Sequence, residues 1–146
     1  MVRKVWLYIL QRRADDVALL VFEHVNVDAG IQIPAGTVEP DEDLQAAARR
    51  ELFEEAGVEV DSLTPLEVVE RHWHGQDVQA HLFAAWEPAN ARDEWIHHVT
   101  GKGEDEGMVF RYFWLPRTEW SQLWGDFKLG YPALNSFIAD LATEQI

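Results

Sequence analysis

The chain has no cysteine among its 146 residues, which excludes disulfide bonds, thiolate nucleophiles and cysteine-ligated zinc sites. It also lacks internal repeats, low-complexity segments and any apolar run long enough to span a bilayer. Residues 1–4 do not lead into a signal-peptide pattern. We therefore expect a cytoplasmic protein that has no membrane partner.

Positive charge is scarce: 12 Lys and Arg stand against 26 Asp and Glu, for a formal net charge of -14. Proteins bind the nucleic-acid backbone through Lys and Arg, so we do not expect a long nucleic acid as a partner. A small anionic substrate remains compatible with this charge if metal cations bridge it to the protein. The acidic balance also favours solubility, and that is an alternative explanation for it.

Apolar residues, in contrast, are plentiful. They make up 47% of the chain and include seven Trp and seven Phe, enough for a core with aromatic side chains left over for a binding pocket. A chain of this length typically forms one domain, and we expect residues 1–146 to be a single domain.

Strand and helix patterns alternate along the chain. The expected strands, from β-forming residues and alternating apolar positions, are 2–11, 16–24, 64–73, 78–87 and 108–115. The expected helices are a long one that begins at Asp41 as N-cap and ends near Ala56 before Gly57, a short one over 117–124, and a last one over 131–144. Residues 88–107 are expected to form a loop. This order predicts an α/β fold with a mixed sheet packed between helices.

The segment "GTVEPDEDLQAAARRELFEEAGV", residues 36–58, places three glutamates within five positions of the long helix. At about 100° per residue, Glu51, Glu54 and Glu55 share an arc of about 100° on the helix. Like charges one turn apart destabilise a helix. Either this face is solvated and partly offset by Arg49 and Arg50, or it is a site for a hard cation such as Mg²⁺ or Mn²⁺, which prefer oxygen ligands.

The spacing of the fixed positions in this segment resembles the signature of the Nudix hydrolase family. The matching residues are Gly36, Glu42, Arg50, Glu51, Leu52, Glu54, Glu55, Gly57 and Val58. The match covers 23 residues, and outside it the resemblance is limited to strand order and a terminal helix.

The resemblance implies an α/β/α sandwich with a mixed β-sheet, in which residues 36–58 form a catalytic loop-helix-loop. It implies cleavage of a pyrophosphate linkage, in a nucleoside diphosphate joined to another moiety or in a nucleoside triphosphate, with Mg²⁺ or Mn²⁺ as cofactor. By position the implied metal ligands are Glu51, Glu54, Glu55 and the carbonyl of Ala35. Arg50 is expected to orient a helix glutamate, Gly36 and Gly57 to shape the backbone, and Glu42 to support the site.

The general base is open at this point. Members of the family place it either on the helix, where Glu51 is the candidate, or in a later loop. The segment "GKGEDEG" offers Glu104, Asp105 and Glu106 as a base or a ligand, and the alternative is a solvated acidic turn.

The substrate is weakly specified. In the family, a proline about fifteen residues after the signature indicates ADP-ribose as the substrate, and a tyrosine slightly further on indicates diadenosine polyphosphates. The sequence at that place is "RHWHG", which contains neither residue. Candidates for stacking on a base are Trp6, Tyr8, Trp73 and Trp95, each with a place in the core as the alternative. Arg3, Arg71 and Arg111 are available for phosphate, although salt bridges with the surplus acid are favoured.

Two other classes of function compete with hydrolysis. A non-catalytic nucleotide-sensing module usually loses the carboxylates of the signature, and this chain keeps all of them. A plain interaction domain with an acidic helix does not account for the full spacing match. Dimerisation is common in the family, so a homodimer is compatible with the resemblance, but no segment of the sequence establishes it.

Overall fold

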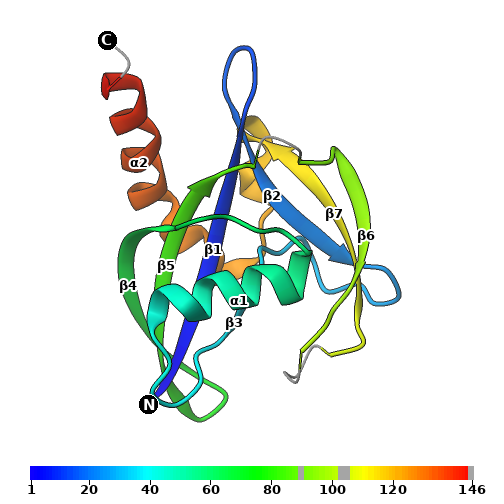
Figure 1. Cartoon of the computed structure of the whole chain (residues 1–146), viewed down its shortest axis with the longest axis vertical. Helices are drawn as coiled ribbons and strands as arrows, with labels where there is room; N and C mark the ends of the chain where they lie inside the picture. Colours follow the sequence, from blue (N-terminus) through cyan, green and yellow to red (C-terminus); the bar gives the residue numbers. More distant parts are fainter. Residues whose placement is uncertain (89–90, 102–105, 145–146) are drawn as a thin grey trace.

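A sheet between helices organises the protein, in a computed structural model that describes residues 1–88, 91–101 and 106–144. Helix α1 (Leu44–Ala56) packs on one face of the sheet, and helix α2 (Tyr131–Glu144) packs on the other (Figure 1). The expected α/β architecture, a mixed sheet with flanking helices, is confirmed.

Seven strands make up the sheet within these residues. They are β1 (Val2–Arg12), β2 (Val17–His24), β3 (Ala35–Thr37), β4 (Thr64–Trp73), β5 (Gln76–Trp86), β6 (Glu94–His98) and β7 (Val109–Pro116). Their order is β4-β5-β1-β2-β7-β6, with β3 beside β1. The β1–β5 pair is parallel and the other pairs are antiparallel, so the sheet is mixed.

Strand β1 is the centre of the sheet and is buried on both faces. Alternate side chains enter two separate cores: Val5 and Leu7 on the α1 side, Trp6 and Tyr8 on the α2 side. A strand covered on both faces reads as a continuous apolar run, which is the pattern of residues 5–10.

Helix α1 begins later than expected. Its N-cap is Asp43, whose side chain accepts a hydrogen bond from the Ala46 amide at 3.0 Å, and not Asp41 as predicted. Asp41 has a positive φ of 62° and lies within a turn that is closed by a hydrogen bond from the Glu42 amide to the Glu39 carbonyl. Both aspartates satisfy the compositional preference for an N-cap, and this turn selects the second one.

Strand β6 lies inside the segment 88–107, which was expected to be a loop. Its five residues pair antiparallel with β7, and Trp95 lies opposite Tyr112. Trp95 is buried while Ile96 is 52% exposed, so the strand carries too short an apolar pattern to stand out from the sequence.

The C-terminal part contains two 3₁₀ helices before α2. The first, η1 (Arg117–Gln122), replaces the helix expected over 117–124, and the second is η2 (Gly125–Gly130). Helix α2 has the bounds that were expected. None of the helices in the described ranges combines the length and apolar character needed to cross a membrane.

Candidate functional site

Helix α1 presents its carboxylates at the edge of its buried face. Ala47, Ala48 and Leu52 are fully buried in the core on this side of the sheet, and they fix the rotation of the helix. Glu51 and Glu55 follow on the same side and are only 8% and 3% exposed. Two carboxylates are therefore held close to the protein interior, where burying a charged group costs free energy unless a counter-charge or a bound ligand compensates it.

The C-terminal end of α1 is held by hydrogen bonds to its last four carbonyls, which have no partner within a helix. The Phe53 carbonyl accepts from the Gly57 amide, and the Glu54 carbonyl accepts from the Thr100 amide and from His97 Nε2. The Glu55 carbonyl accepts from the Tyr112 hydroxyl, and the Ala56 carbonyl accepts from the Trp95 indole nitrogen. Most of these donors come from β6, β7 and the segment that follows β6. The unforeseen strand thus positions the carboxylates of the helix.

Two glycines make room for the glutamates. A Cβ at Gly36, on β3, would overlap the carboxylate of Glu51. A Cβ at Gly101, which has a φ of 92°, would lie 2.5 Å from the carboxylate carbon of Glu54. Gly36 was expected from its place in the signature, whereas no signal in the sequence marks Gly101, because its approach to α1 depends on β6.

Arg50 is the counter-charge of the site, and all of its guanidinium donors find acceptors. Nε and Nη2 bind the two carboxylate oxygens of Glu42 at 2.8 and 2.9 Å. Nη1 binds Glu51 at 2.9 Å and Glu54 at 3.1 Å, and Nη2 also binds the Thr37 carbonyl at 3.1 Å. The arginine therefore joins the loop before α1, the strand β3 and two glutamates of the helix.

This network shifts the ionisation of its members. The hydrogen bond to Arg50 is the main reason that the pKa of Glu42 lies below its ordinary value. The same bond raises the pKa of Arg50, and burial opposes that shift only in part. Both groups are thus kept charged.

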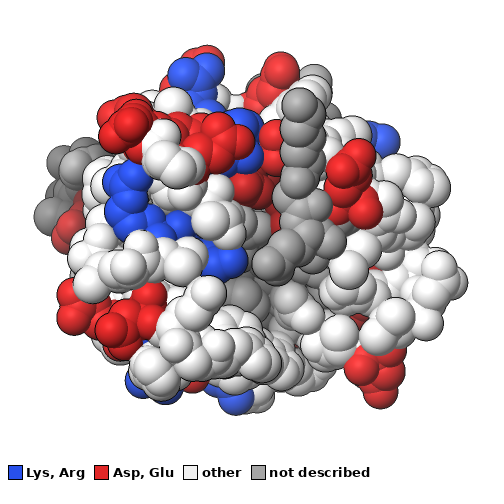
Figure 2. Space-filling view, turned by 90° about the horizontal axis from the view of Figure 1, so that it is seen from below, with Lys and Arg blue, Asp and Glu red and all other residues white. Residues whose placement is uncertain are grey.

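A cavity of about 630 Å³ opens beside this network. Glu51, Glu54, Glu55 and Glu106 line it, together with Gly36 and Gly101. Figure 2 views the end of the molecule at which β1 starts, and shows Asp and Glu side chains close to a band of Lys and Arg side chains. Glu106 is exposed at the rim; Glu104 and Asp105, the other two candidates from the loop, lie outside the described residues.

The carbonyl of Ala35 points away from β1. Just before β3 the Pro34 carbonyl accepts from the Leu7 amide on β1, whereas the Thr37 carbonyl on β3 accepts from Arg50. Successive carbonyls of a strand point to opposite sides, so that of Ala35 points away from β1, as does that of Thr37. This direction agrees with the ligand role that the resemblance implies.

The donors around the cavity suit a hard cation. Carboxylate oxygens and a backbone carbonyl are the ligands that Mg²⁺ and Mn²⁺ take, and two of the carboxylates are nearly buried. In the described part of the chain, no group of three or more His, Asp or Glu side chains is already arranged to hold a metal ion. Arg50 Nη1 lies between Glu51 and Glu54, so a cation at these two carboxylates must compete with the arginine.

The four aromatic candidates do not come together. Trp6 and Tyr8 are buried on the α2 side of the sheet, where the Tyr8 hydroxyl donates to the Phe127 carbonyl at 2.7 Å. Trp95 is buried on the α1 side, stacked on Tyr112. Trp73 alone among the four is exposed, at 44%.

The three arginines that were candidates for binding phosphate have protein partners. Arg71 pairs with Asp126, and Arg111 pairs with Glu23 and Glu94. Arg3 donates to the Glu39 carbonyl at 3.4 Å.

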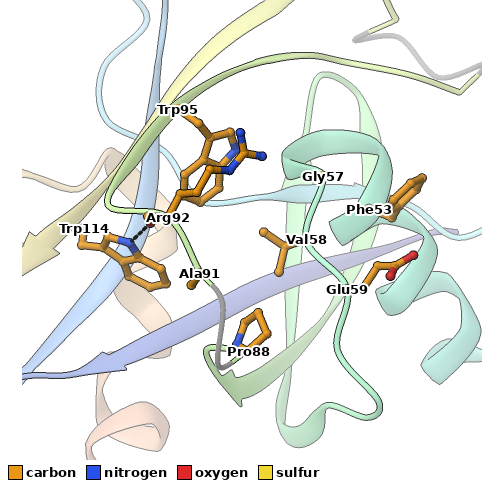
Figure 3. A pocket seen from close by; sticks show the side chains of 9 residues that line it. All are labelled: Phe53, Gly57, Val58, Glu59, Pro88, Ala91, Arg92, Trp95 and Trp114. Atoms are coloured by element: carbon orange, nitrogen blue, oxygen red, sulfur yellow. Dashed lines mark hydrogen bonds between the residues drawn. The ribbon is translucent and has the colours of Figure 1, made fainter.

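A second cavity, of about 360 Å³, lies beyond the C-terminal end of α1 (Figure 3). Trp95 and Trp114 form part of its wall, and the guanidinium of Arg92 lies 5.5 Å from the Trp95 ring centre. Its lining includes a single carboxylate, that of Glu59. The space therefore lacks the clustered oxygen ligands of the first cavity.

Comparison with known proteins agrees with this geometry. The family model described as the NUDIX domain matches residues 2–134. An Ap4A hydrolase of C. elegans, solved as a binary complex, is 19% identical with a TM-score of 0.71, and the match covers 96% of this chain and 99% of that one. A NUDIX hydrolase of Listeria monocytogenes is 19% identical with a TM-score of 0.70 and 94% coverage of both chains.

The NUDIX domain of Shewanella oneidensis NrtR, solved with ADP-ribose, is 16% identical with a TM-score of 0.64, covering 86% of this chain and 79% of that one. No curated protein sequence matches the chain. Identities this low show a shared fold, whereas the family model spans nearly the whole chain and includes every position of the signature. The chain belongs to the NUDIX domain family.

Proposed function

We propose that this protein is a Mg²⁺-dependent hydrolase that cleaves the pyrophosphate linkage of a nucleoside diphosphate derivative or a nucleoside triphosphate. Membership in the NUDIX family supports a pyrophosphohydrolase. The observation that carries the finer proposal is the group of glutamates that line one cavity beside Gly36, among them Glu51, Glu54, Glu55 and Glu106. So many acidic groups at one cavity suit a reaction in which cations neutralise a diphosphate.

Glu51, Glu54 and Glu55 would hold the cation, together with the carbonyl of Ala35. When bound, Mg²⁺ or Mn²⁺ neutralises phosphate oxygens and lowers the pKa of a water molecule. Arg50 positions Glu51 and Glu54 through the hydrogen bonds from its Nη1. Anchored at both ends, α1 keeps these carboxylates in place without reorganisation during the reaction.

A carboxylate must also accept the proton of the attacking water. Glu51 is the candidate on the helix. Glu106, which lines the same cavity, is the candidate from the later segment. Replacement of the true base by glutamine removes the acidic limb of the pH–rate profile, whereas replacement of a ligand weakens cation binding. Profiles of Glu51→Gln and Glu106→Gln, with Mg²⁺ affinity measured in parallel, assign the two roles.

An assay panel tests the function. Release of phosphate, pyrophosphate or nucleotide is measured with Mg²⁺ for nucleoside triphosphates, nucleotide sugars, ADP-ribose and diadenosine tetraphosphate. The last two are included because one of the similar structures is an Ap4A hydrolase and another contains ADP-ribose. The proteins compared are the intact chain, Glu55→Gln, and Glu59→Gln as a matched loss of one exposed carboxylate next to α1.

We expect turnover of at least one compound by the intact chain and by Glu59→Gln, and its loss in Glu55→Gln. Binding without turnover in the intact chain would instead indicate a nucleotide-sensing module. Indifference to every compound and to divalent cations would contradict both functions.

A further inference from the structure

The second cavity, beyond the C-terminal end of α1, is large enough for one small organic molecule. Its volume is about 360 Å³, and ligand cavities in proteins begin at about 300 Å³. It shares no lining residue with the carboxylate cavity. Most of its wall is apolar, formed by the side chains of Val58, Pro88, Ala91, Trp95 and Trp114.

Hydrogen bonds hold the aromatic part of this wall in place. The Trp95 indole donates to the Ala56 carbonyl at 2.9 Å, and the Trp114 indole donates to the Arg92 carbonyl at 2.9 Å. The two tryptophans are only 7% and 6% exposed. Because the wall is already fixed, a ligand that fills the cavity does not have to order it, and this favours binding.

Arg92 brings a positive charge to the cavity. Its guanidinium lies over the Trp95 ring, 5.5 Å from the ring centre, as Figure 3 shows. The residue is exposed, so a ligand can reach it from solvent. Among the side chains that the structure describes, no carboxylate forms an ion pair with this guanidinium.

Two of the three other arginines that lie over aromatic rings do have carboxylate partners. Arg117 lies 5.6 Å from the ring centre of Trp120, and it binds Asp16 at 3.1 Å. Arg111 also lies over a ring and binds two glutamates. In a chain with 26 Asp and Glu, an arginine beside a cavity without such a partner is available to an anion from solution.

The charges around the cavity restrict which anion fits. A guanidinium binds a carboxylate through two parallel hydrogen bonds. Glu59 also lines the cavity, and Figure 3 shows it on the side away from Trp114. Its negative charge disfavours a multiply charged phosphate, whereas a single carboxylate can bind Arg92 while an apolar ring fills the remaining space.

We propose that the second cavity binds a small aromatic monocarboxylate, whose carboxylate pairs with Arg92 and whose ring lies against Val58, Trp95 and Trp114. This site is separate from the proposed hydrolysis and needs no metal ion. The bound molecule touches Gly57 and Val58, the residues that directly follow α1.

Binding in EDTA provides the test, followed by fluorine NMR. The probes share one ring and differ in charge: 4-fluorobenzoate, the neutral 4-fluorobenzyl alcohol and the cationic 4-fluorobenzylamine. We expect 4-fluorobenzoate to bind with a Kd of about 0.1 to 5 mM. The alcohol should bind about 3- to 10-fold more weakly, and the amine more weakly still.

Two variants separate the charge from the space. Arg92→Gln should weaken 4-fluorobenzoate by about 3- to 10-fold and leave the alcohol unchanged. Val58→Phe should abolish binding of both probes, because the larger side chain occupies the cavity. Arg117→Gln is the matched control: this arginine also lies over a tryptophan, and it does not line the cavity.

A measurement on the intact chain accompanies these variants. The indole N–H resonances of Trp95 and Trp114 should shift with 4-fluorobenzoate. That of Trp120, which donates to the Leu115 carbonyl on the other side of the sheet, should stay in place.

Equal affinity of the intact chain and folded Arg92→Gln for 4-fluorobenzoate would overturn the proposal, as would tighter binding of the amine. So would absence of binding, unshifted Trp95 and Trp114 resonances, or binding that requires Mg²⁺, which would place the probe in the carboxylate cavity. None of these measurements depends on turnover. A chain that binds the probe and hydrolyses no nucleotide would refute the proposed function and keep this site.

Discussion

At the scale of single residues, Arg50 is the organising side chain of the site. Its guanidinium satisfies Glu42 with two hydrogen bonds, at 2.8 and 2.9 Å, and distributes the remaining donors over Glu51, Glu54 and the Thr37 carbonyl. The planar fork of arginine matches a carboxylate in a way that the ammonium of lysine does not. Glu42 is therefore a structural partner whose removal acts on the site through Arg50.

Glu42→Gln should lower the free energy of unfolding by about 1.5 to 3 kcal/mol at pH 7, since it converts a doubly hydrogen-bonded charged pair into a neutral contact. The pKa of Glu42 is lowered from 4.5 in the folded protein, so this contribution is fully present above pH 4.5. It is lost as the pH falls through the folded pKa, because the unfolded chain binds the proton more readily.

Urea unfolding in EDTA, at a series of pH values from 7 down to about 3, measures this difference. The gap between the intact chain and Glu42→Gln should close toward the acidic end. Glu59→Gln, which alters an exposed carboxylate, should show little difference throughout. A gap that does not depend on pH would refute the role of the Glu42 charge.

Gly36→Ala should destabilise the protein by about 1 to 3 kcal/mol, because the new methyl group overlaps the carboxylate of Glu51. The effect should nearly vanish in a Glu51→Ala background, where that carboxylate is gone. A double-mutant cycle of urea unfolding free energies isolates this coupling. Equal effects of Gly36→Ala in the two backgrounds would show that the glycine serves the backbone of β3 and not the glutamate.

At the scale of secondary structure, the C-terminal end of α1 shows how distant strands hold this helix. The Glu55 carbonyl accepts from the Tyr112 hydroxyl at 2.7 Å, and the Ala56 carbonyl accepts from the Trp95 indole at 2.9 Å. Both donors are buried and belong to paired strands, β7 and β6. The position of Glu54 and Glu55 is therefore coupled to the edge of the sheet.

Tyr112→Phe should lower stability by about 1 to 2 kcal/mol and weaken Mg²⁺ binding, since only the hydroxyl is lost and the helix end moves more freely. Tyr131→Phe is the control: its hydroxyl binds the Trp120 carbonyl on the α2 side of the sheet. That variant should lose similar stability without a change in Mg²⁺ affinity. Calorimetric titration with Mg²⁺ compares the two, and equal affinity in both would contradict the coupling.

The elements near the site could be predicted because local sequence patterns define them. The features that were missed depend on contacts between residues far apart in the sequence. The spacing of Glu51, Glu54 and Glu55 on one helix follows from the pitch of the helix, and the apolar run of β1 marks a strand buried on both faces. Strand β6 stayed hidden because its only strong signal is a single buried tryptophan, Trp95. The second cavity was equally hidden, since the segments that line it lie far apart in the sequence and meet only in the folded sheet.

At the scale of the whole molecule, the net charge of -14 on 146 residues lowers the stability of the folded state, because the negative charges repel one another. Salt screens such repulsion over about 10 Å at 0.1 M. Cations bound at the carboxylate cavity, as proposed, would do more than screen, because they would bind the folded chain and not the unfolded one. Screening depends only on ionic strength, whereas binding at the cavity depends on which cation is present, so a comparison of two cations separates the two effects.

Mg²⁺ at 100 times its Kd should raise the Tm by about 5 to 10 °C beyond a choline chloride solution of the same ionic strength. In Glu55→Gln the specific part of this increase should disappear while the response to choline chloride remains. Thermal unfolding followed by circular dichroism measures both. Identical responses to the two salts in the intact chain would contradict cation binding at the cavity.

The parallel pairing of β1 with β5 has a consequence for biosynthesis. Val2 lies beside Val78 and Leu10 beside Trp86, so β1 finds this partner only after about 75 further residues have been made. Pairing between strands so far apart in sequence closes a long loop and is correspondingly slow. Nascent chains that end before residue 86 therefore lack part of the strand that pairs with one edge of β1, and an unpaired strand edge of this kind is what a chaperone shields.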